Sequence, residues 1–260
     1  MSNENTTAQK EILDTQKELI DAEKSKMQKY QQLIVGEKGL WKMMKYELII
    51  TLFSWIPGAV GILLRSKLYP KILGQVGRNV VFGANIAIRH PFKIRIGDDV
   101  VIDDHCVLDA KGSGNKGITI GNGVFIGRNT ILTCHDGDIV LEDNVNIGFN
   151  CVISSLGTIV IKENHLMAAF CYLVGGDHVA DRTDVPILYQ GRTAKGIMLE
   201  ENIWLGAGVA VLDGSTIGRD SIIGAHAVVT NKIPPYSIAV GAPAKVLRDR
   251  RENAQKQKEK

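Results

Sequence analysis

An aliphatic residue returns at every sixth position between residues 199 and 229, and this strict period constrains the fold more than any other feature. The positions are Leu199, Leu205, Val211, Ile217, Ile223 and Val229. An α-helix repeats every 3.6 residues and a half-buried strand every 2.0, so neither element gives a period of six. A hexapeptide repeat does, and it predicts an all-β solenoid in which three short strands and their corners close each coil.

The same pattern extends back to about residue 81 and predicts six regular coils within a solenoid over residues 81–246. Four insertions interrupt it, at 110–117, 134–138, 155–158 and 175–198. Insertions in a repeat protein collect on loops and often form the binding face. The longest one, 175–198, is therefore the first place to look for function.

Composition narrows the class of protein. The 260 residues are 45% apolar and only 6% aromatic, which suits a core of Ile, Val and Leu. A net charge of +3, without a basic and aromatic binding motif, argues against nucleic acid as a partner. Cys106, Cys151 and Cys171 fall at small-residue core positions and no CxxC pair occurs, which indicates a reducing cytoplasm. The polar N-terminal sequence has no signal-peptide pattern.

The N-terminal 80 residues divide into two helical segments. Residues 1–35 predict a helix in which Leu13, Ile20, Met27 and Ile34 recur at intervals of seven. Because only one of the two heptad positions is consistently apolar, a coiled coil and a helix lying on the protein or on a membrane both stay open.

Residues 36–80 form an apolar and basic segment. Its stretch 48–64 has no charge and is broken by Pro57-Gly58. Two short helices meeting at that break suit either a peripheral membrane contact through residues 36–72 or a cap over the open end of the solenoid. At the other end of the chain, residues 247–260 predict a charged C-terminal tail.

The 175–198 insertion carries the candidate catalytic group, His178. A neutral imidazole can take a proton from a hydroxyl or an amine as it attacks a thioester. The neighbouring Asp177 is expected to orient that ring and to stabilise its cation. Further polar side chains of the same loop are candidates for binding the substrate: Asp181, Arg182, Asp184 and Tyr189.

The other histidines are weaker candidates. His135, in a corner after Thr133-Cys134, ranks second to His178. Corner positions, where an exposed polar residue is unremarkable, hold His105 and His226. His165 occupies a small-residue core position, so we expect it to be partly buried and hydrogen-bonded.

Three motifs carry a family resemblance. They are Ile203-Trp204-Leu205-Gly206-Ala207-Gly208, the Gly-Gly-Asp-His loop, and the Pro234-Pro235-Tyr236-Ser237 and Gly241-Ala242-Pro243-Ala244 segments. Together they resemble the hexapeptide-repeat acyltransferases, closest to the bacterial O-acetyltransferases of sugars and polysaccharides. The resemblance covers about residues 80–247. It implies a left-handed parallel β-helix and a homotrimer with sites between neighbouring subunits. It also implies acetyl-CoA as co-substrate, no metal, and a loop histidine, here His178, as general base.

The resemblance also implies a donor site. Trp204 would line its acyl end, and backbone N–H groups at the Gly206-Ala207 and Gly224-Ala225 corners would face the thioester or the pantetheine arm. The CoA phosphates would contact polar and basic residues: Thr230, Lys232, Lys245 and Arg248. The adenine would pack near Ala242 and Pro243. The first 80 residues lie outside the family pattern, and the segment 165–168 is bulkier than that pattern.

The sequence thus favours transfer of an acetyl group to a hydroxyl of a sugar, polysaccharide precursor or lipid-linked glycan, by a cytoplasmic protein or one peripheral to the inner face of the membrane. N-acetylation of a nucleotide-linked amino sugar stays open, because the same base serves both. A zinc carbonic anhydrase on the same solenoid would need three converging imidazoles, and no such local set occurs. A non-catalytic trimeric scaffold is the remaining alternative, although a scaffold has no need of the His178 loop.

Overall fold

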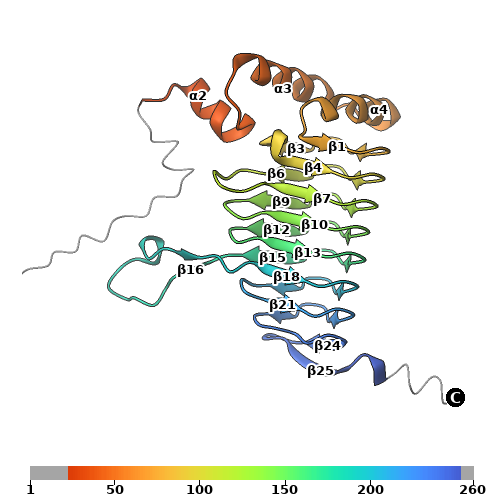
Figure 1. Ribbon diagram of the computed structural model, residues 1–260, viewed down its shortest axis with the longest axis vertical. Helices are drawn as coiled ribbons and strands as arrows, with labels where there is room; N and C mark the ends of the chain where they lie inside the picture. The colour runs from red at the N-terminus through yellow and green to blue at the C-terminus, as the bar shows by residue number, and fades with distance from the viewer. Residues whose placement is uncertain (1–22, 253–260) are drawn as a thin grey trace, which may run out of the picture.

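The structure, a computed structural model, describes residues 23–252. Its body is a parallel β-solenoid of three long sheets (Figure 1), as the six-residue period predicts. The six repeat aliphatics from Leu199 to Val229 are fully buried in its core. Cys106, Cys151 and Cys171 are free and buried in the same core, as expected, and so is Cys134.

Each coil contributes one strand to each sheet, in a fixed order. The first sheet contains β1 (Gln75–Val76), β4 (Ile94–Ile96), β7 (Ile118–Ile120), β10 (Ile139–Leu141), β13 (Ile159–Ile161), β18 (Ile197–Leu199) and β21 (Thr216–Ile217). The second contains β2 (Val81–Phe82), β5 (Val101–Ile102), β8 (Phe125–Ile126), β11 (Asn146–Ile147), β14 (Leu166–Met167), β19 (Trp204–Leu205), β22 (Ile222–Ile223), β24 (Ser237–Val240) and β25 (Lys245–Asp249). The third contains β3 (Ala87–Arg89), β6 (Val107–Asp109), β9 (Ile131–Cys134), β12 (Val152–Ser155), β15 (Tyr172–Gly175), β20 (Ala210–Val211) and β23 (Val228–Val229).

Two boundaries differ from the sequence-based expectation. The solenoid begins at β1, with Gln75, rather than at residue 81, so the coil β1–β2–β3 precedes the six predicted coils. At the other end β25 runs to Asp249, so residues 247–249 are not a charged tail. They pair antiparallel with β24, whose Ser237 lies opposite Asp249. The predicted tail beyond residue 252 and the predicted helix before residue 23 lie outside the described residues.

All four insertions leave the solenoid at one corner, where the third sheet turns into the first. They connect β6 to β7, β9 to β10, β12 to β13, and β15 to β18. The longest forms an arm, which we define as residues 177–193. It contains the antiparallel pair β16 (Asp177–His178) and β17 (Arg192–Thr193) and the 3₁₀ turn η4 (Ile187–Tyr189), and it projects away from the coils (Figure 1).

Helices cover the N-terminal end of the solenoid. After α2 (Lys26–Tyr30) and the π-helical turn η1 (Gln31–Val35) come α3 (Leu40–Phe53), α4 (Gly58–Leu68) and the 3₁₀ turn η2 (Tyr69–Lys71). A further 3₁₀ turn, η3 (Pro91–Lys93), follows β3. We call residues 40–71 the helical cap. The chain breaks between α3 and α4 before Pro57, which caps α4 at its first residue, Gly58, as the Pro57-Gly58 pair in the sequence predicts.

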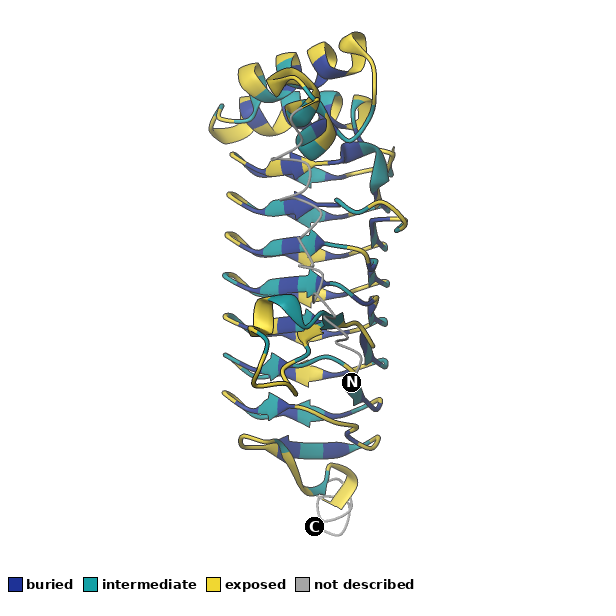
Figure 2. Cartoon of the chain, turned by 90° about the vertical axis from the view of Figure 1, so that its left-hand side faces the viewer, coloured by how far each residue is buried: buried dark blue, intermediate teal, exposed yellow. Residues whose placement is uncertain are grey.

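The cap has a buried and an exposed apolar face. Its inner side packs on the solenoid through Ile49 and Tyr69, and the Tyr46 hydroxyl donates a 2.7 Å hydrogen bond to the Ile88 carbonyl. Figure 2 shows many exposed positions on the helices at the top of the molecule. The large apolar residues exposed on the cap are Leu40, Trp41, Met44, Leu48, Leu52, Trp55, Val60, Ile62 and Leu63. Among residues 23–252, no helix has both the length and the hydropathy needed to cross a bilayer.

Candidate active site

A groove of about 1230 Å³ runs along the insertion corner. One wall is the outer face of the third sheet, which contributes Ser154, Tyr172 and Val174. The opposite boundaries are the η1 segment at one end and the base of the arm at the other. The groove thus follows the corner at which the sequence is interrupted most often, and it brings together side chains from residues 32 to 213.

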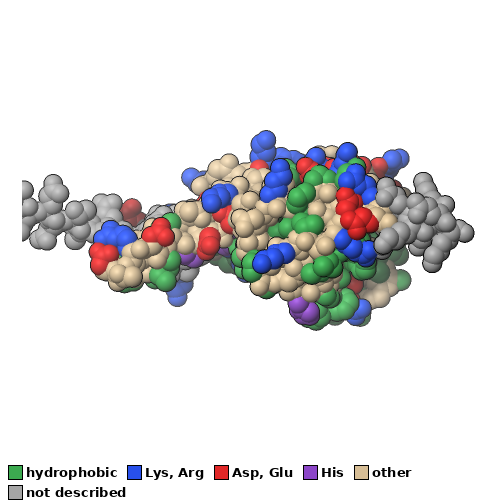
Figure 3. Space-filling view, turned by 90° about the horizontal axis from the view of Figure 1, so that it is seen from below, with side chains coloured by type: hydrophobic (Ala, Val, Ile, Leu, Met, Phe, Trp, Pro, Cys, Tyr) green, Lys and Arg blue, Asp and Glu red, His purple; other side chains and the backbone are tan. Residues whose placement is uncertain are grey.

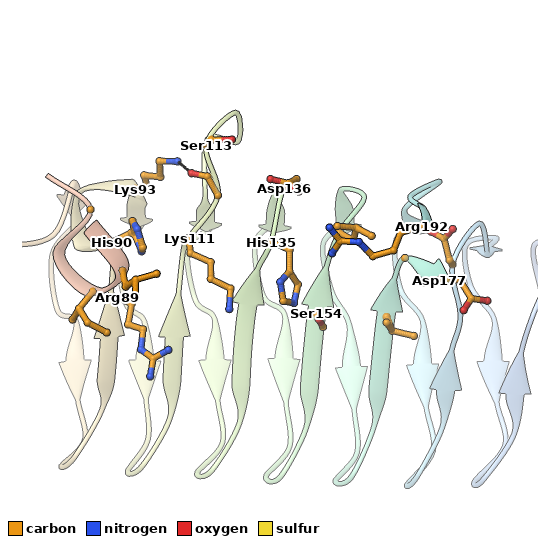
Figure 4. Close-up of a pocket in the computed structure, with 18 of the residues that line it drawn as sticks. Arg89, His90, Lys93, Lys111, Ser113, His135, Asp136, Ser154, Asp177 and Arg192 are labelled. Atoms are coloured by element: carbon orange, nitrogen blue, oxygen red, sulfur yellow. Dashed lines mark hydrogen bonds between the residues drawn. The ribbon is translucent and has the colours of Figure 1, made fainter. Parts of the chain in front are cut away.

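Both leading histidine candidates line this groove. His178 is exposed at the base of the arm, opposite Arg192 in the β16–β17 pair. His135 is half-buried, and Figure 4 shows its ring on the sheet face with Lys111 on one side and Arg192 reaching toward it from the other. Neither imidazole has a hydrogen bond to any residue in the described range. Each is therefore available to a ligand in the groove.

The electrostatic surroundings favour a neutral His135. Burial lowers the pKa of its imidazole, and the nearby charges of Lys111 and Arg192 lower it further, against the opposing influence of Asp109 and Asp136. A neutral imidazole can accept a proton or a hydrogen bond from an acceptor hydroxyl. His135 therefore stands as a second group of the groove that can act on a substrate.

The Asp177 carboxylate contacts the backbone of His178, whereas the sequence predicts a contact with the His178 ring. Its Oδ1 accepts a 2.8 Å hydrogen bond from the backbone N–H of His178. Asp177 and His178 are neighbours on β16, and both line the groove. The geometry of this chain gives Asp177 a role in holding the arm backbone, and the orientation of the His178 ring by Asp177 stays a prediction.

The four candidate substrate residues lie farther out on the arm and do not line the groove. Arg182 and Asp184 form an exposed ion pair, with Arg182 Nη2 2.6 Å from Asp184 Oδ2. Asp181 and Tyr189 also lie beyond the groove. Their contact with a substrate stays a prediction, and the arm could present them to another molecule.

The candidate donor residues form a separate set toward the C-terminal end. Most lie on the second sheet or beside it, whereas Thr230 and Lys232 follow β23 of the third sheet. Trp204 is exposed on β19. The N–H groups of Gly206 and Gly224 are used in the ladder, donating to the carbonyls of Ile223 and Ala239. Those of Ala207 and Ala225 have no partner among residues 23–252, so only the alanine of each corner can offer a donor.

The C-terminal end also carries basic side chains, which Figure 3 shows around the end of the solenoid. Lys232 and Lys245 are exposed, Arg248 is half-buried, and none of the three has an ion pair within the described chain. Thr230, Ala242 and Pro243 are exposed beside them. Unpaired cations next to available N–H groups fit a ligand with several phosphates. None of this set lines the groove that contains His178.

Sequence reasoning missed the basic end of the groove. Arg89, Lys93 and Lys111 line it, close to η1. His90 closes this end: its Nε2 lies 3.1 Å from the Gln32 carbonyl, which ties η1 to the solenoid. The one available signal was that Arg89 and Asp109 stand 20 residues apart in paired strands, which is three six-residue repeats plus two extra residues.

The described residues contain no group of three or more His, Cys, Asp or Glu side chains that could hold a metal ion. The buried His165 bonds through Nδ1 to the Lys162 carbonyl at 2.8 Å, and its Nε2 has no partner. His165 is thus more deeply buried and less completely hydrogen-bonded than the sequence suggested.

Comparisons with known proteins agree with the repeat. Residues 196–231 match the family model described as bacterial transferase hexapeptide (six repeats), and residues 138–163 match the hexapeptide repeat of succinyl-transferase. A probable acetyltransferase of Mycobacterium tuberculosis is 41% identical over 133 residues, 51% of this chain and 44% of the relative. A galactoside O-acetyltransferase of Lactococcus lactis is 32% identical over 135 residues, 52% of this chain and 54% of the relative.

Among solved structures, the N-acyltransferase AntD from Bacillus cereus, in complex with dTDP and 3-hydroxybutyryl-CoA, aligns with a TM-score of 0.52. It is 20% identical, and the alignment covers 80% of this chain and 96% of that one. At this identity the likeness concerns the fold. The chain spans about half the length of the curated relatives it matches.

Fold and repeat therefore define this protein as a hexapeptide-repeat β-solenoid with a groove at its insertion corner. The chain carries the hexapeptide repeat of bacterial transferases, and the relatives that share this part of the chain are named acetyltransferases.

Proposed function

We propose that this protein transfers an acetyl group from acetyl-CoA to a hydroxyl of a sugar, polysaccharide precursor or lipid-linked glycan, with His178 as general base. The observation that carries the proposal is the placement of His178. A polar arm, inserted into an otherwise regular solenoid, positions an exposed imidazole without a hydrogen-bond partner on the groove. The relatives named acetyltransferase, one of them a galactoside O-acetyltransferase, support this reaction class.

In the proposed reaction His178 accepts the proton of the acceptor hydroxyl as its oxygen attacks the acetyl carbonyl carbon. The carbon–sulfur bond breaks, and the imidazolium returns the proton to the departing thiolate. The products are an acetyl ester and free CoA thiol, so atoms and charges balance. The unpaired N–H groups of Ala207 and Ala225 can stabilise the pantetheine arm or the carbonyl oxygen by hydrogen bonds.

The donor and acceptor groups of one chain do not share a groove, which supports a site shared between subunits. We propose a homotrimer in which the arm of one subunit meets the Trp204 side of its neighbour. Asp181, Arg182, Asp184 and Tyr189 would then contact the acceptor across that junction. A monomer at micromolar concentration, measured by light scattering after size-exclusion chromatography, would contradict this assembly.

The outer face of the helical cap supports a peripheral membrane contact through residues 36–72. Trp41 and Trp55 are 76% and 61% exposed, and such side chains favour the bilayer interface. Five exposed lysines flank this face, against Glu37 and Glu47: Lys38, Lys42, Lys45, Lys67 and Lys71. An apolar face with a basic border suits an anionic lipid surface. The four buried free thiols agree with the reducing, cytoplasmic side of that surface.

N-acetylation of a nucleotide-linked amino sugar is the second candidate. It is favoured by the structural neighbour, an N-acyltransferase that carries dTDP in its complex. The same imidazole would then deprotonate an ammonium nitrogen before attack. A sugar amine that turns over while its hydroxyl counterpart does not would select this candidate.

Release of CoA thiol from acetyl-CoA tests the proposal, with a panel of sugars and a membrane extract as acceptors. We expect His178→Ala to reduce turnover roughly 100- to 10,000-fold, as for the loss of a general base. The control is His226→Ala, because His226 is an exposed corner histidine outside the groove. Unchanged turnover in His178→Ala would reject the assignment. If the release of CoA thiol depended neither on an acceptor nor on the His178 imidazole, the result would favour the non-catalytic scaffold.

A further inference from the structure

Three polar side chains surround the His135 ring in the middle of the groove. Figure 4 shows Lys111 on one side of the ring and Arg192 reaching toward it from the other. The charges of both cations lower the pKa of the His135 imidazole, so both lie within electrostatic reach of it. Ser154 lines the same groove from the adjacent strand β12, and the backbone N–H of His135 donates a 2.8 Å hydrogen bond to the Ser155 carbonyl of that strand. Two cations and a hydroxyl therefore gather near one imidazole.

Arg192 is the unpaired cation of this cluster. Lys111 has a counter-charge, since its Nζ lies 3.5 Å from Asp109 Oδ2. Among residues 23–252, no carboxylate lies within ion-pair distance of the Arg192 guanidinium and no group accepts a hydrogen bond from it. Asp136 follows His135 in the chain, but Figure 4 shows its carboxylate above the corner, away from the ring. The cluster thus has an excess of about one positive charge, which a monoanion would balance.

The chemistry of these groups suits a carboxylate. The planar guanidinium of an arginine donates two parallel hydrogen bonds to the two oxygens of a carboxylate, and such charged pairs are stronger than neutral ones. The neutral imidazole of His135 has one N–H donor, and the Ser154 hydroxyl is a second donor. Neither side chain has a hydrogen-bond partner within the described chain. All three groups are available to one anion.

The cluster also lies close to the proposed base. Arg192 stands directly opposite His178 in the β16–β17 pair, and both side chains line the groove. Directly opposed residues of antiparallel strands have Cα atoms about 5 Å apart. One sugar ring, with a hydrogen bond of about 2.9 Å at either side, can therefore bridge the imidazole and the guanidinium.

We propose that the acceptor of this groove is an acidic sugar, which carries a carboxylate and its hydroxyls on one ring. The carboxylate binds the Arg192 guanidinium and accepts hydrogen bonds from His135 and Ser154. A hydroxyl of the same ring meets His178. This assignment rests on the proposed acetyl transfer and narrows its acceptor class. Arg192 and His135 orient the acceptor, and proton transfer stays with His178.

Titration by saturation-transfer NMR on the full chain tests the site without requiring turnover. The probes are glucuronate, galacturonate and N-acetylneuraminate, each compared with its methyl ester, which keeps the ring and removes the charge. Acetate has the charge without the ring.

The test variant is Arg192→Gln. A second variant, His135→Leu, lies outside the arm and copies Leu156, which occupies the equivalent position of the next coil. The control is Arg95→Gln, since Arg95 is exposed outside the groove.

We expect the wild type to bind at least one of the acids about tenfold or more tightly than its ester and than acetate. Arg192→Gln should remove this preference, His135→Leu should reduce it by about threefold or more, and Arg95→Gln should retain it. If circular dichroism shows that Arg192→Gln does not fold, His135→Leu decides. A wild type that binds none of the acids, or that binds acid, ester and acetate alike, would overturn the proposal. A preference that persists in both variants would overturn it too.

Thiol release separates this proposal from the acetyl transfer on which it rests. A higher kcat/KM for the bound acid than for its ester supports both. An acid that binds through Arg192 while no acceptor gives release would reject acetyl transfer and leave the acidic-sugar site standing. Release with a neutral sugar at the same kcat/KM in the wild type and in Arg192→Gln would keep acetyl transfer and overturn the acidic acceptor.

Discussion

The carboxylate of Asp177 accepts a 2.8 Å hydrogen bond from the backbone N–H of His178. In a catalytic triad the corresponding carboxylate contacts the imidazole N–H and fixes its tautomer. Here the bond joins two adjacent residues and fixes the local backbone at the start of the arm. Asp177 is therefore a positioning residue for the arm in this chain, and its effect on catalysis should follow from backbone geometry.

Two substitutions of Asp177 test this role, because only one of them keeps an acceptor for the His178 N–H. Asp177→Asn keeps an oxygen acceptor for the His178 N–H, and we expect it to retain turnover within about threefold. Asp177→Ala removes the acceptor and should reduce turnover by less than about tenfold without moving the pH profile, because the imidazole loses no partner. A loss approaching 10,000-fold in both variants, as when a triad carboxylate is removed, would instead show that Asp177 orients the ring.

Arg65 connects the helical cap to the solenoid. It is 1% exposed, and its guanidinium donates to the carbonyls of Phe82, Phe53 and Ile56 at 3.0, 3.2 and 2.6 Å. Arg65→Met would leave these carbonyls without a charged donor, and each unsatisfied buried group costs about 1–3 kcal/mol. We expect the free energy of unfolding, measured in urea, to fall by roughly 3 kcal/mol. The cap should also become sensitive to limited proteolysis. Lys67→Met, an exposed neighbour, is the control and should change neither measurement.

Much of the fold could be predicted because the repeat is strict. A period of six assigns Leu205 and Ile223 to the core without any knowledge of the coil geometry, and both are fully buried. The two ends of the solenoid were harder to predict from the sequence. Val76 stands six residues before Phe82 and so continues the period, but it is only partly buried at the end of the solenoid. β25 reverses direction and does not continue the period.

The candidate site could be predicted only in part. His178 stands out because polar residues are concentrated in one insertion, which is a local signal. The cluster of Arg89, Lys93 and Lys111 depends on insertions stacking at one corner, and an insertion of unknown length removes the register between coils. No local pattern distinguishes Arg65, a buried clamp, from the exposed lysines around it, because its partners are backbone carbonyls.

The exposed face of the cap should bind anionic vesicles. We expect the protein to float with vesicles of phosphatidylglycerol and phosphatidylcholine, less with pure phosphatidylcholine, and less again at raised salt, which screens the lysines. Leu48→Gln with Leu52→Gln should lower the partition coefficient by about tenfold or more, since it removes apolar area from the contact. Leu247→Gln, at the opposite end and also exposed, is the control.

Two outcomes would contradict the membrane contact. Wild-type protein that never floats would reject it directly. Larger assemblies in solution that disappear in the Leu48 and Leu52 variant would show that the outer face of the cap pairs with a second copy of the protein.

The buried His165 should make the fold sensitive to acid. Burial lowers the pKa of its imidazole from 6.5 to about 4. The unfolded chain therefore binds the proton more readily than the folded one, and stability falls as the pH drops from 6.5 toward 4. This single group accounts for a loss of roughly 3 kcal/mol across that window.

Replacement of this imidazole should reduce the slope of unfolding free energy against pH. The equivalent positions of the neighbouring coils hold Val145 and Ile203, both buried, so His165→Val matches the local packing and removes the unpaired Nε2. We expect His165→Val to be at least as stable as wild type at about pH 7 and to lose less stability by about pH 5 in urea titrations. His226→Asn keeps a residue that tolerates the left-handed corner and should leave the slope unchanged. An identical slope in His165→Val and wild type would mean that other buried groups, His90 and His135 among them, cause the acid sensitivity.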